Sequence, residues 1–565
     1  MIERMEEGIK RRTLAAAGLA IAALAIAMPV LNPDIYWHLS AGRWMTLHRA
    51  LPSADFLSWT ERGAPWTDFE WLSQLAFYAA WSAAGKAGLF ALKLAVLGAS
   101  FLPFIGLLRL YGLASAGWWA LPLWGLALLP NSDVRPENFS VLFFALLLWR
   151  LEKSRVSGRA WPSGAAGFAG LAAFFAVWAN LHAGFAYGIL LLLTYAAGAA
   201  ADRRSGGTLS TWPPLFAAFA AAAGALVNPW GWRIYSVLIE HSADAASLSR
   251  WLAEWMAPRL SNPLHWPFFA MAAACAALMA WRWARLRRPP AAHLAALCWL
   301  GFGAFSHSRH LVFFCMAALA FSLDSAAAVY GAERTARAGR ALLAAALLYL
   351  AAAVWPRYLA FGVNIGEEAA GAADYLRANA AALGGRRLYN PWNWGGYLGW
   401  ALPPEYPVYV DGRYLFHKYL PRVSAAMEDQ NSWAAFAGQN GFELALFRRD
   451  GASVALTQPG PGGVPVELRR PAYLVFMPKK DWALLYWDRW SLLFARRGRP
   501  LPPEFAVLRP GDFDAVKLAL CAGQLKKEDL AAELARYAAL PGRPSSESRG
   551  LAGWLGSFPD SCLAR

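Results

Sequence analysis

The chain has 565 residues, of which 58% are hydrophobic and only 16% are charged, and its formal net charge is +16. So few charges cannot cover the surfaces of the three or four water-soluble domains that this length suggests, and the same figures exclude disordered, collagen-like and disulfide-scaffold proteins. The composition therefore predicts a polytopic α-helical membrane protein.

The charges are distributed unevenly on the two sides of Trp355. Residues 1–355 contain 28 Lys or Arg and 17 Asp or Glu, whereas residues 356–565 contain 25 and 20, so charge rises from about 13% to about 21%. We therefore expect a multi-span transmembrane domain over 1–355, an α/β domain over 356–540 and a loose tail over 541–565. No basic stripe interleaved with aromatic residues occurs, so nucleic acid is not an expected partner.

Eleven apolar runs, several of them short, predict about eleven transmembrane helices. The first run follows Lys10-Arg11-Arg12 and lacks a good cleavage site after it, which favours an uncleaved anchor over a signal peptide. The runs cover residues 13–31, 86–108, 116–131, 138–151, 163–181, 183–201, 212–227, 264–284, 291–305, 308–323 and 341–355.

The basic residues between the runs predict the orientation. With the N-terminus in the cytoplasm, 18 Lys and Arg fall on the inner side and nine on the outer side. This bias predicts a multi-pass protein of the cytoplasmic (inner) membrane, and the odd number of runs makes the C-terminal domain extracytoplasmic, or periplasmic. Three cysteines fall inside predicted helices, while Cys521 and Cys562 are left as an open pair in an oxidising exterior.

Polar residues gather in the outer turns, whereas the inner loops hold little beyond Arg, Gly and Ser. The turn after the first run contains Asp34, and a long outer loop over about 32–85 continues to Asp68 and Glu70. For any one residue, helix capping or interfacial anchoring is the alternative role. Together they offer a general base, a candidate metal site and cations for a phosphate. The later outer turns contain Arg135, Glu137, His182, Glu254, Arg309 and His310.

The C-terminal domain has the pattern of a mixed α/β fold. A helix is expected over 367–382, stopped by two glycines, and a β-hairpin is expected from 482–486 and 491–494. The remaining expected elements are strands at 387–389, 408–410 and 453–457, helical segments over 419–440 and 512–540, and a Gly- and Pro-rich loop over 457–471.

The outer-side residues suit the transfer of a sugar from a lipid-linked phosphate. A carboxylate would deprotonate or orient the acceptor, and an arginine or a divalent cation, magnesium or manganese, would stabilise the departing phosphate. No G-x-x-x-x-G-K-[ST] loop occurs, so no nucleotide cofactor is expected. The expected partners are a lipid-linked sugar donor, membrane lipid, and a glycan, lipid or protein acceptor.

The front half resembles the GT-C superfamily of integral-membrane glycosyltransferases, which includes protein O-mannosyltransferases, aminoarabinose transferases and oligosaccharyltransferases. That superfamily has an essential Asp just after the first span, and Asp34 in Asn-Pro-Asp-Ile-Tyr-Trp-His matches it by position. The resemblance implies that Asp34 is catalytic, with Asp68 and Glu70 as a second acidic pair that assists it or binds a cation. Arg135, Arg309, His310 and His182 then become candidates for binding the donor phosphate.

A further similarity concerns the acceptor. The segment from Asn390 to Tyr397, followed by Val410-Asp411-Gly412-Arg413, is similar to the Trp-Trp-Asp-Tyr-Gly region of oligosaccharyltransferases, although Asn393 replaces the acid. The resemblance implies acceptor-binding roles for Trp392, Asn393, Tyr397, Asp411 and Arg413. The alternative is that the glycines form tight turns and that Asp411 pairs with Arg413.

Three functions remain open from the sequence. A GT-C glycosyltransferase needs Asp34. A transporter or flippase of lipid-linked material would need midplane charges and repeated halves, which the sequence lacks. A non-catalytic membrane scaffold that presents its outer domain would tolerate substitution of Asp34, Asp68 and Glu70.

Overall fold

The computed structural model describes residues 2–204, 212–286, 289–337, 339–356, 359, 365–449, 453–459, 465–540 and 546–558. Its contacts divide the chain into two compact units. The first unit comprises Met1–Asn32, Ala41–Ser53 and Thr67–Gly362, and the second comprises Pro33–Ser40, Ala54–Trp66 and Val363–Arg565. Two short pieces of the first outer loop therefore fold with the C-terminal part of the chain.

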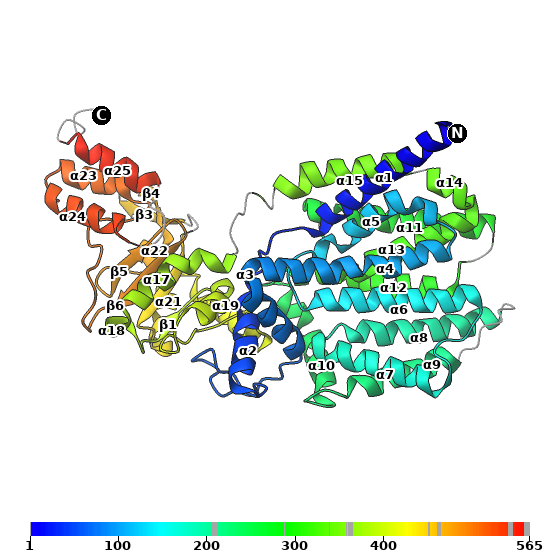
Figure 1. The fold of residues 1–565 in the computed structure, drawn as a ribbon. Coiled ribbons are helices and arrows are strands. Elements are labelled where there is room, and N and C mark those ends of the chain that lie inside the picture. Colours follow the sequence, from blue (N-terminus) through cyan, green and yellow to red (C-terminus); the bar gives the residue numbers. More distant parts are fainter. Residues whose placement is uncertain are drawn as a thin grey trace. The chain divides into compact units, whose positions relative to one another are not determined.

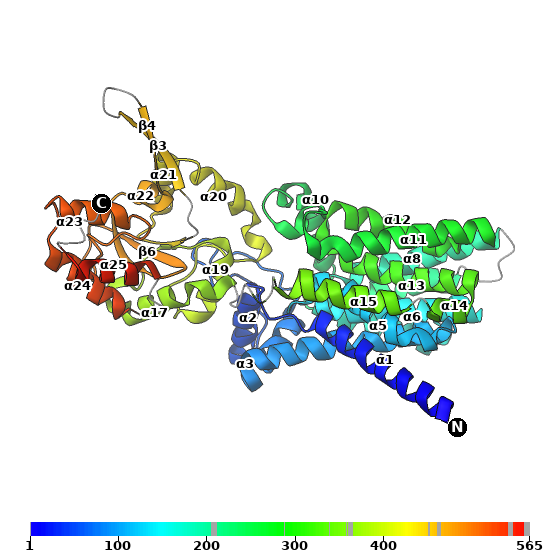
Figure 2. The same ribbon diagram turned by 90° about the horizontal axis from the view of Figure 1, so that it is seen from above.

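The first unit is a bundle of helices (Figures 1 and 2). Each of the eleven apolar runs falls on a helix. The helices are α1 (Ile2–Ile26), α2 (Ile35–His48, shared between the units), α3 (Trp71–Ala99), α4 (Phe101–Leu110), α5 (Gly117–Leu128), α6 (Glu137–Ser157), α7 (Gly164–Leu181), α8 (Phe185–Arg203), α9 (Trp212–Ala225), α10 (Arg233–Leu248), α11 (Trp266–Arg285), α12 (Ala291–Ser306), α13 (Leu311–Tyr330), α14 (Ala332–Arg337) and α15 (Gly339–Tyr349).

Five helical stretches of the described chain are long and apolar enough to cross a membrane. They are Trp71–Leu110, Gly164–Leu181, Phe185–Arg203, Pro263–Arg285 and Ser308–Tyr330, and four shorter apolar helices accompany them. The chain is thus a multi-pass helical membrane protein, while the count of eleven spans stays a prediction.

The segment 32–85, expected as a long outer loop, contains two helical stretches, and its outer location stays a prediction. It contains α2 and the first half of α3, which begins at Trp71 and is interrupted at Ala84 and Gly85. Gly85 has φ of +57°, a conformation that favours glycine. The predicted start of the second span at residue 86 therefore coincides with this interruption.

Close helix contacts hold the first unit together. A Cβ on Gly18 of α1 would lie 1.9 Å from the carbonyl oxygen of Trp118 in α5, so a larger residue would force the two helices apart. Nearby, Phe104 and Trp124 stack with ring centroids 4.4 Å apart. In Figure 2, α11, α12 and α13 run side by side, as their contacts require.

The second unit is built on a four-stranded sheet, ordered β1-β2-β6-β5, from β1 (Leu388–Tyr389), β2 (Leu444–Arg448), β6 (Ser491–Arg496) and β5 (Trp482–Trp487). The first pair is parallel and the others are antiparallel, which confirms the expected hairpin. Leu444 and Leu446 face one buried cluster while Ala445 faces the other. Both faces of the sheet are therefore covered, which explains why its strands lack polar alternation.

The other elements of the second unit agree only partly with the sequence. The segment 408–410 is not a strand, because Val408 instead bridges to Ser58. The expected loop over 457–471 contains a strand, β4 (Pro465–Pro471), which pairs with β3 (Ser453–Pro459) in a hairpin that projects in Figure 2. The helices are α17 (Ala370–Ala378), α18 (Ala380–Leu383), α19 (Trp392–Ala401), α20 (Leu420–Ala426), α21 (Gln430–Asn440), α22 (Ala472–Phe476), α23 (Phe513–Cys521), α24 (Lys527–Ala538) and α25 (Ser546–Gly556).

The C-terminal segment differs from the loose tail expected over 541–565. It forms α25, whose Leu551 and Leu555 are buried in the core, because these two side chains face one side of the helix. Cys521 is disulfide-bonded, and Cys562 lies outside the described residues.

Candidate active site

The Asp34 carboxylate lies directly against the backbone of Gly412 in the second unit. The carbonyl of Asp34 accepts the N–H of Trp37 at 3.1 Å and that of His38 at 3.3 Å, which begins the first turn of α2. A Cβ placed on Gly412 would be only 2.0 Å from Asp34 Oδ1, so only glycine lets the chain pass this close to the carboxylate. The indole Nε1 of Trp37 lies 3.2 Å from the same Cβ position.

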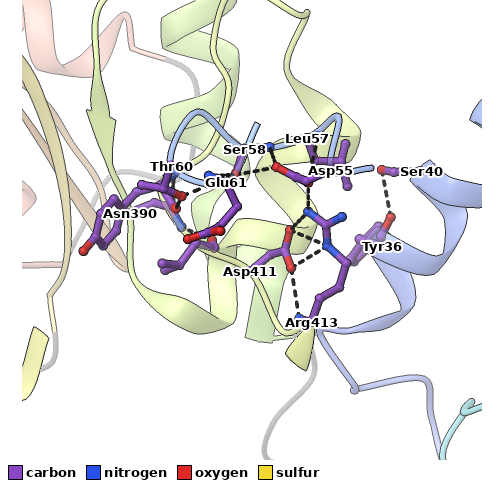
Figure 3. A network of polar contacts seen from close by, with 12 residues as sticks. Tyr36, Ser40, Asp55, Leu57, Ser58, Thr60, Glu61, Asn390, Asp411 and Arg413 are labelled. Atoms are coloured by element: carbon purple, nitrogen blue, oxygen red, sulfur yellow. Dashed lines mark hydrogen bonds and ion pairs between the residues drawn. The ribbon is translucent and has the colours of Figure 1, made fainter. Parts of the chain in front are cut away.

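The segment that carries Gly412 is fixed by a buried ion network (Figure 3). Arg413 places Nη2 2.5 Å from Asp55 Oδ1 and 2.7 Å from Asp411 Oδ2, while its Nε lies 2.9 Å from Asp411 Oδ1. The side chains are 1%, 0% and 0% exposed, respectively. Burial alone lowers the pKa of Arg413, but the charges of Asp411 and Asp55 raise that pKa above its ordinary value, so the guanidinium stays charged.

Asp55 also organises its own loop. Its carboxylate accepts the N–H of Leu57 at 3.2 Å, and the N–H and hydroxyl of Ser58 at 3.1 and 2.6 Å. Farther along, Thr60 donates to the carbonyl of Tyr409 (Figure 3). The loop 54–66 is therefore tied to the chain segment that leads into Asp411. The contacts between Arg413 and Asp411 confirm the pairing that the sequence left open.

The predicted acceptor residues on α19 surround the same region. Tyr397 packs edge to face on Tyr36, with ring centroids 5.0 Å apart, and the Tyr36 hydroxyl donates to Glu367. Trp392 stacks on His417 at 6.1 Å, whereas Asn393 is exposed.

The two glycines of this segment do not form tight turns, because they lie inside α19. A Cβ on Gly395 would be 1.8 Å from the carbonyl oxygen of Val410, and one on Gly396 would be 3.2 Å from that of Pro33. The glycines therefore allow α19 to pack closely against both the Asp34 segment and the Asp411 segment.

The predicted acidic pair lies in the first unit. Asp68 is buried, and Gln74 Nε2 donates to its Oδ1 at 2.6 Å. Glu70 Oε1 is 3.7 Å from His182 Nε2. His182 Nδ1 accepts the N–H of Gly184 at 3.0 Å, so the ring hydrogen is on Nε2 and faces Glu70.

A chain of hydrogen bonds supports this histidine. Trp178 Nε1 donates to Ser140 Oγ at 2.7 Å, and that hydroxyl lies 2.8 Å from His182 Nδ1. His182 Nδ1 carries no hydrogen, because it accepts the N–H of Gly184, so the Ser140 hydroxyl must donate to it. The oxygen of the same hydroxyl accepts the N–H of Trp178. The network holds the imidazole as a donor toward Glu70.

The two predicted phosphate-binding arginines share one carboxylate. Glu254 contacts Arg135 through Oε2, and Arg309 Nη1 lies 3.7 Å from its Oε1. The Arg309 guanidinium also lies over the Trp255 ring, 4.4 Å from its centroid. Arg135 and Arg309 keep 35% and 27% of their side chains exposed, and Glu137 lies within electrostatic reach of both. Two partly exposed cations thus meet at Glu254, with Glu137 nearby.

His310 is placed differently from the arginines. Its Nδ1 contacts the Tyr187 hydroxyl, and its ring packs near His307 with centroids 5.8 Å apart. It therefore supports the segment that carries Arg309.

The described residues contain no group of three or more His, Cys, Asp and Glu arranged to hold a metal ion. Asp68 is bound by an amide and Glu70 faces a histidine N–H, so these two acids do not form a donor set as arranged. The divalent-cation site expected at Asp34, Asp68 and Glu70 stays a prediction.

A second buried cluster, which the sequence did not indicate, lies near the C-terminal end of α6. It is about 22 Å along the helix from Glu137, at 1.5 Å per residue. Glu152 is fully buried there and forms an ion pair with Arg155. Its contacts with side chains from several helices hold the ends of those helices together. Its partners are Tyr111 and Tyr195 at 2.6 Å, Arg155 at 2.6 Å and His293 at 2.9 Å.

Sequence reasoning assigned no role to the residues that orient the predicted ones. Asp55, Ser140 and Glu254 lie far along the chain from the groups they hold. Gly412 was included only as part of a turn. One signal was available. Asp55 and Glu254 lie in predicted outer turns, and Ser140 lies near the start of α6, directly after another predicted outer turn.

Comparisons with known proteins give a fold but no family by sequence. No family model matches the chain. No curated protein matches it. Among solved structures, the archaeal oligosaccharyltransferase AglB from Archaeoglobus fulgidus, in complex with an inhibitory peptide and a dolichol-phosphate, aligns with a TM-score of 0.54 at 12% identity. That alignment covers 98% of this chain and 87% of AglB.

Two other solved structures are similar. The Archaeoglobus fulgidus oligosaccharyltransferase tethered to an acceptor peptide containing the NVT sequon gives a TM-score of 0.53 at 13% identity, over 84% of this chain and 79% of that one. ArnT from Cupriavidus metallidurans bound to undecaprenyl phosphate gives 0.47 at 14% identity, over 87% and 99%, and this score is too low to carry an argument. The chain thus has the fold of the archaeal oligosaccharyltransferase, which is the fold that the sequence resemblance implied.

Proposed function

We propose that the chain transfers a sugar from a polyprenyl-phosphate-linked donor to an acceptor at the outer face of the cytoplasmic membrane. The observation that carries this proposal is the Asp34 carboxylate, which lies against Gly412, next to the buried network of Arg413, Asp411 and Asp55. The fold supports it, because AglB has the same fold and is recorded with a dolichol-phosphate and a peptide.

In this proposal Asp34 acts on the acceptor. Its carboxylate takes a proton from the acceptor nucleophile, while Trp37 Nε1, a buried donor without a hydrogen-bond partner in the described structure, donates to the same group. An acceptor hydroxyl fits this pair because a hydroxyl both donates and accepts. A bond forms from the acceptor oxygen to the anomeric carbon as the bond from that carbon to the phosphate oxygen breaks.

The donor phosphate is assigned to the first unit. Arg135 and Arg309 stabilise the charge that develops on the departing polyprenyl phosphate, and Glu254 pairs with both guanidinium groups and so holds them near each other. Glu70, oriented by His182, and Asp68 assist at the sugar.

The outer location rests on two observations. The basic residues favour the inner side two to one, and the second unit contains a disulfide-bonded Cys521, which is typical of an oxidising compartment.

The proposal is tested with the full-length protein in nanodiscs and a panel of polyprenyl-phosphate sugars, each offered with membrane-extract acceptors. Mass spectrometry follows the release of polyprenyl phosphate. We expect release from at least one donor and loss of that release in Arg309→Gln. If no donor is consumed but the lipid-linked substrate crosses the bilayer of a vesicle, the protein is a flippase. If neither is observed, the scaffold role is favoured.

A further inference from the structure

A buried arginine in the second unit has an unoccupied hydrogen-bonding edge. Arg509 follows the sheet and precedes α23, and only 4% of it is exposed. Its Nε and Nη2 atoms are both buried and have no hydrogen-bond partner in the described structure. These two nitrogens form one edge of the guanidinium, and they present two parallel N–H donors to a pair of oxygens.

Arg413, in the same unit and just as buried, shows how such an edge is normally satisfied. Its Nε and Nη2 atoms both contact the Asp411 carboxylate, at 2.9 and 2.7 Å. Arg386 also has two buried nitrogens without a hydrogen-bond partner, Nε and Nη1, but they do not form one edge, because its Nη2 donates to the carbonyl of Pro500 at 2.8 Å. A buried charge without a partner is costly, so the free edge of Arg509 marks a position where a pair of ligand oxygens belongs.

Other cations gather on the segment 504–509 that leads to Arg509. Lys479 Nζ donates to the carbonyl of Ala506 at 2.9 Å. Arg497 Nη2 lies 2.6 Å from Glu504 Oε2, and Arg536 donates to the carbonyl of Glu504. Lys479 is exposed, and Arg497 and Arg536 are 39% and 34% exposed. Lys479 and Arg497 lie within electrostatic reach of Arg509.

The carboxylates nearby are already used. Glu533 accepts the backbone N–H groups of Ala506, Val507 and Leu508 at 2.6–3.0 Å, and Glu504 is held by Arg497. Asp512 pairs with Arg470 at 2.8 Å. Lys479, Arg497, Arg509 and Arg536 therefore face two carboxylates, which leaves two positive charges uncompensated at the site.

We propose that Arg509 is the floor of a phosphate-binding site, with Lys479 and Arg536 at its rim. A phosphate monoester dianion supplies two oxygens for the Nε and Nη2 edge and carries the two negative charges that the site lacks. The same chemistry is presented by a soluble phosphate and by the phosphate headgroup of a membrane lipid. This site is separate from Asp34 and does not depend on the proposed transferase activity.

The test uses full-length protein in phosphatidylcholine nanodiscs, titrated with inorganic phosphate and followed by calorimetry. We expect saturable binding, and a loss of affinity of at least tenfold in Arg509→Gln. Arg470→Gln is the matched control, because it removes a neighbouring positive charge that already has its carboxylate, and it should bind as the unsubstituted protein does. Absence of binding, or equal binding by Arg509→Gln, overturns the proposal.

Two further arms complete the design. If Arg509→Gln fails to fold by circular dichroism, Lys479→Gln, an exposed rim substitution, takes its place and should weaken binding at least threefold; unchanged binding overturns the proposal. Nanodiscs containing phosphatidic acid distinguish the sources. A lipid occupant lowers the apparent affinity for inorganic phosphate, whereas a soluble occupant leaves it unchanged, and both results support a phosphate site.

Discussion

Two regions of the molecule contain arginines paired with carboxylates, but they differ in how deeply the pairs are buried. Arg413 in the second unit is 1% exposed and is bound by two buried carboxylates, whereas Arg135 and Arg309 in the first unit are about a third exposed and share Glu254. A buried arginine bound by two buried carboxylates fixes its surroundings, while a partly exposed arginine can be reached by a substrate. Burial and pairing therefore separate the supporting residues from those that act on a ligand.

The largest expected effect comes from breaking the buried network. Arg413→Gln leaves Asp55 and Asp411 buried without a cation and should lower the free energy of unfolding of the second unit by about 3–5 kcal/mol. Denaturant titration monitored by tryptophan fluorescence measures this. Arg489→Gln removes an exposed arginine that lies over Trp490 and should change stability by no more than about 0.5 kcal/mol. Equal effects of the two substitutions would contradict the supporting role of Arg413.

Gly412→Ala tests both the position of the Asp34 carboxylate and its effect on the proposed transfer reaction. The added methyl group overlaps Asp34 Oδ1, so the carboxylate must move, and a displacement of about 1 Å is expected to lower kcat by about 100-fold. Gly438→Ala is the control, because nothing lies within 4 Å of its Cβ position. Activity of Gly412→Ala equal to that of the control would show that Asp34 does not need this position.

Arg309→Gln tests the role of the partly exposed arginines that pair with Glu254. Loss of one charged hydrogen bond, worth about 1.5–3 kcal/mol, should raise KM for the lipid-linked donor by about 10- to 100-fold while stability stays unchanged. The donor dependence of initial rates measures KM. Arg250→Gln, an exposed arginine of the same unit, should leave KM as it is. A loss of stability in place of the KM effect would make Arg309 a supporting residue like Arg413.

The smallest effect is expected for Tyr36→Phe. This change removes only the hydroxyl that donates to Glu367 and keeps the ring against Tyr397, so stability should fall by about 1 kcal/mol. Thermal unfolding measures it, and Tyr330→Phe, a half-exposed position, is the comparison. A loss as large as that of Arg413→Gln would place Tyr36 inside the essential network.

Much of the helical organisation was predictable because apolar runs are long and local. All eleven runs fall on helices, and the position of Asp34 after the first run was sufficient to select it. The candidate acids and arginines could be selected because charged residues are scarce in the front half, and their roles stay predictions.

The rest depended on contacts between distant parts of the chain. The segment 408–410 reads as a strand, but Val408 donates to the carbonyl of Leu57 at 3.2 Å and accepts from Trp59 at 3.0 Å, so its partner is a loop some 350 residues earlier. Arg413 binds Asp55 across a similar separation. The Glu152 cluster draws its side chains from several helices. No periodicity within a single segment encodes such pairings.

The central claim, that Asp34 is the carboxylate that activates the acceptor, is tested most directly by Asp34→Asn in nanodiscs supplied with a productive donor and acceptor. Transfer and donor binding are measured on the same sample, with Asp514→Asn, an exposed acid, as the control. We predict a fall in kcat of at least about 100-fold, with donor binding and thermal stability unchanged. A folded Asp34→Asn protein that retains full transfer activity would contradict the account.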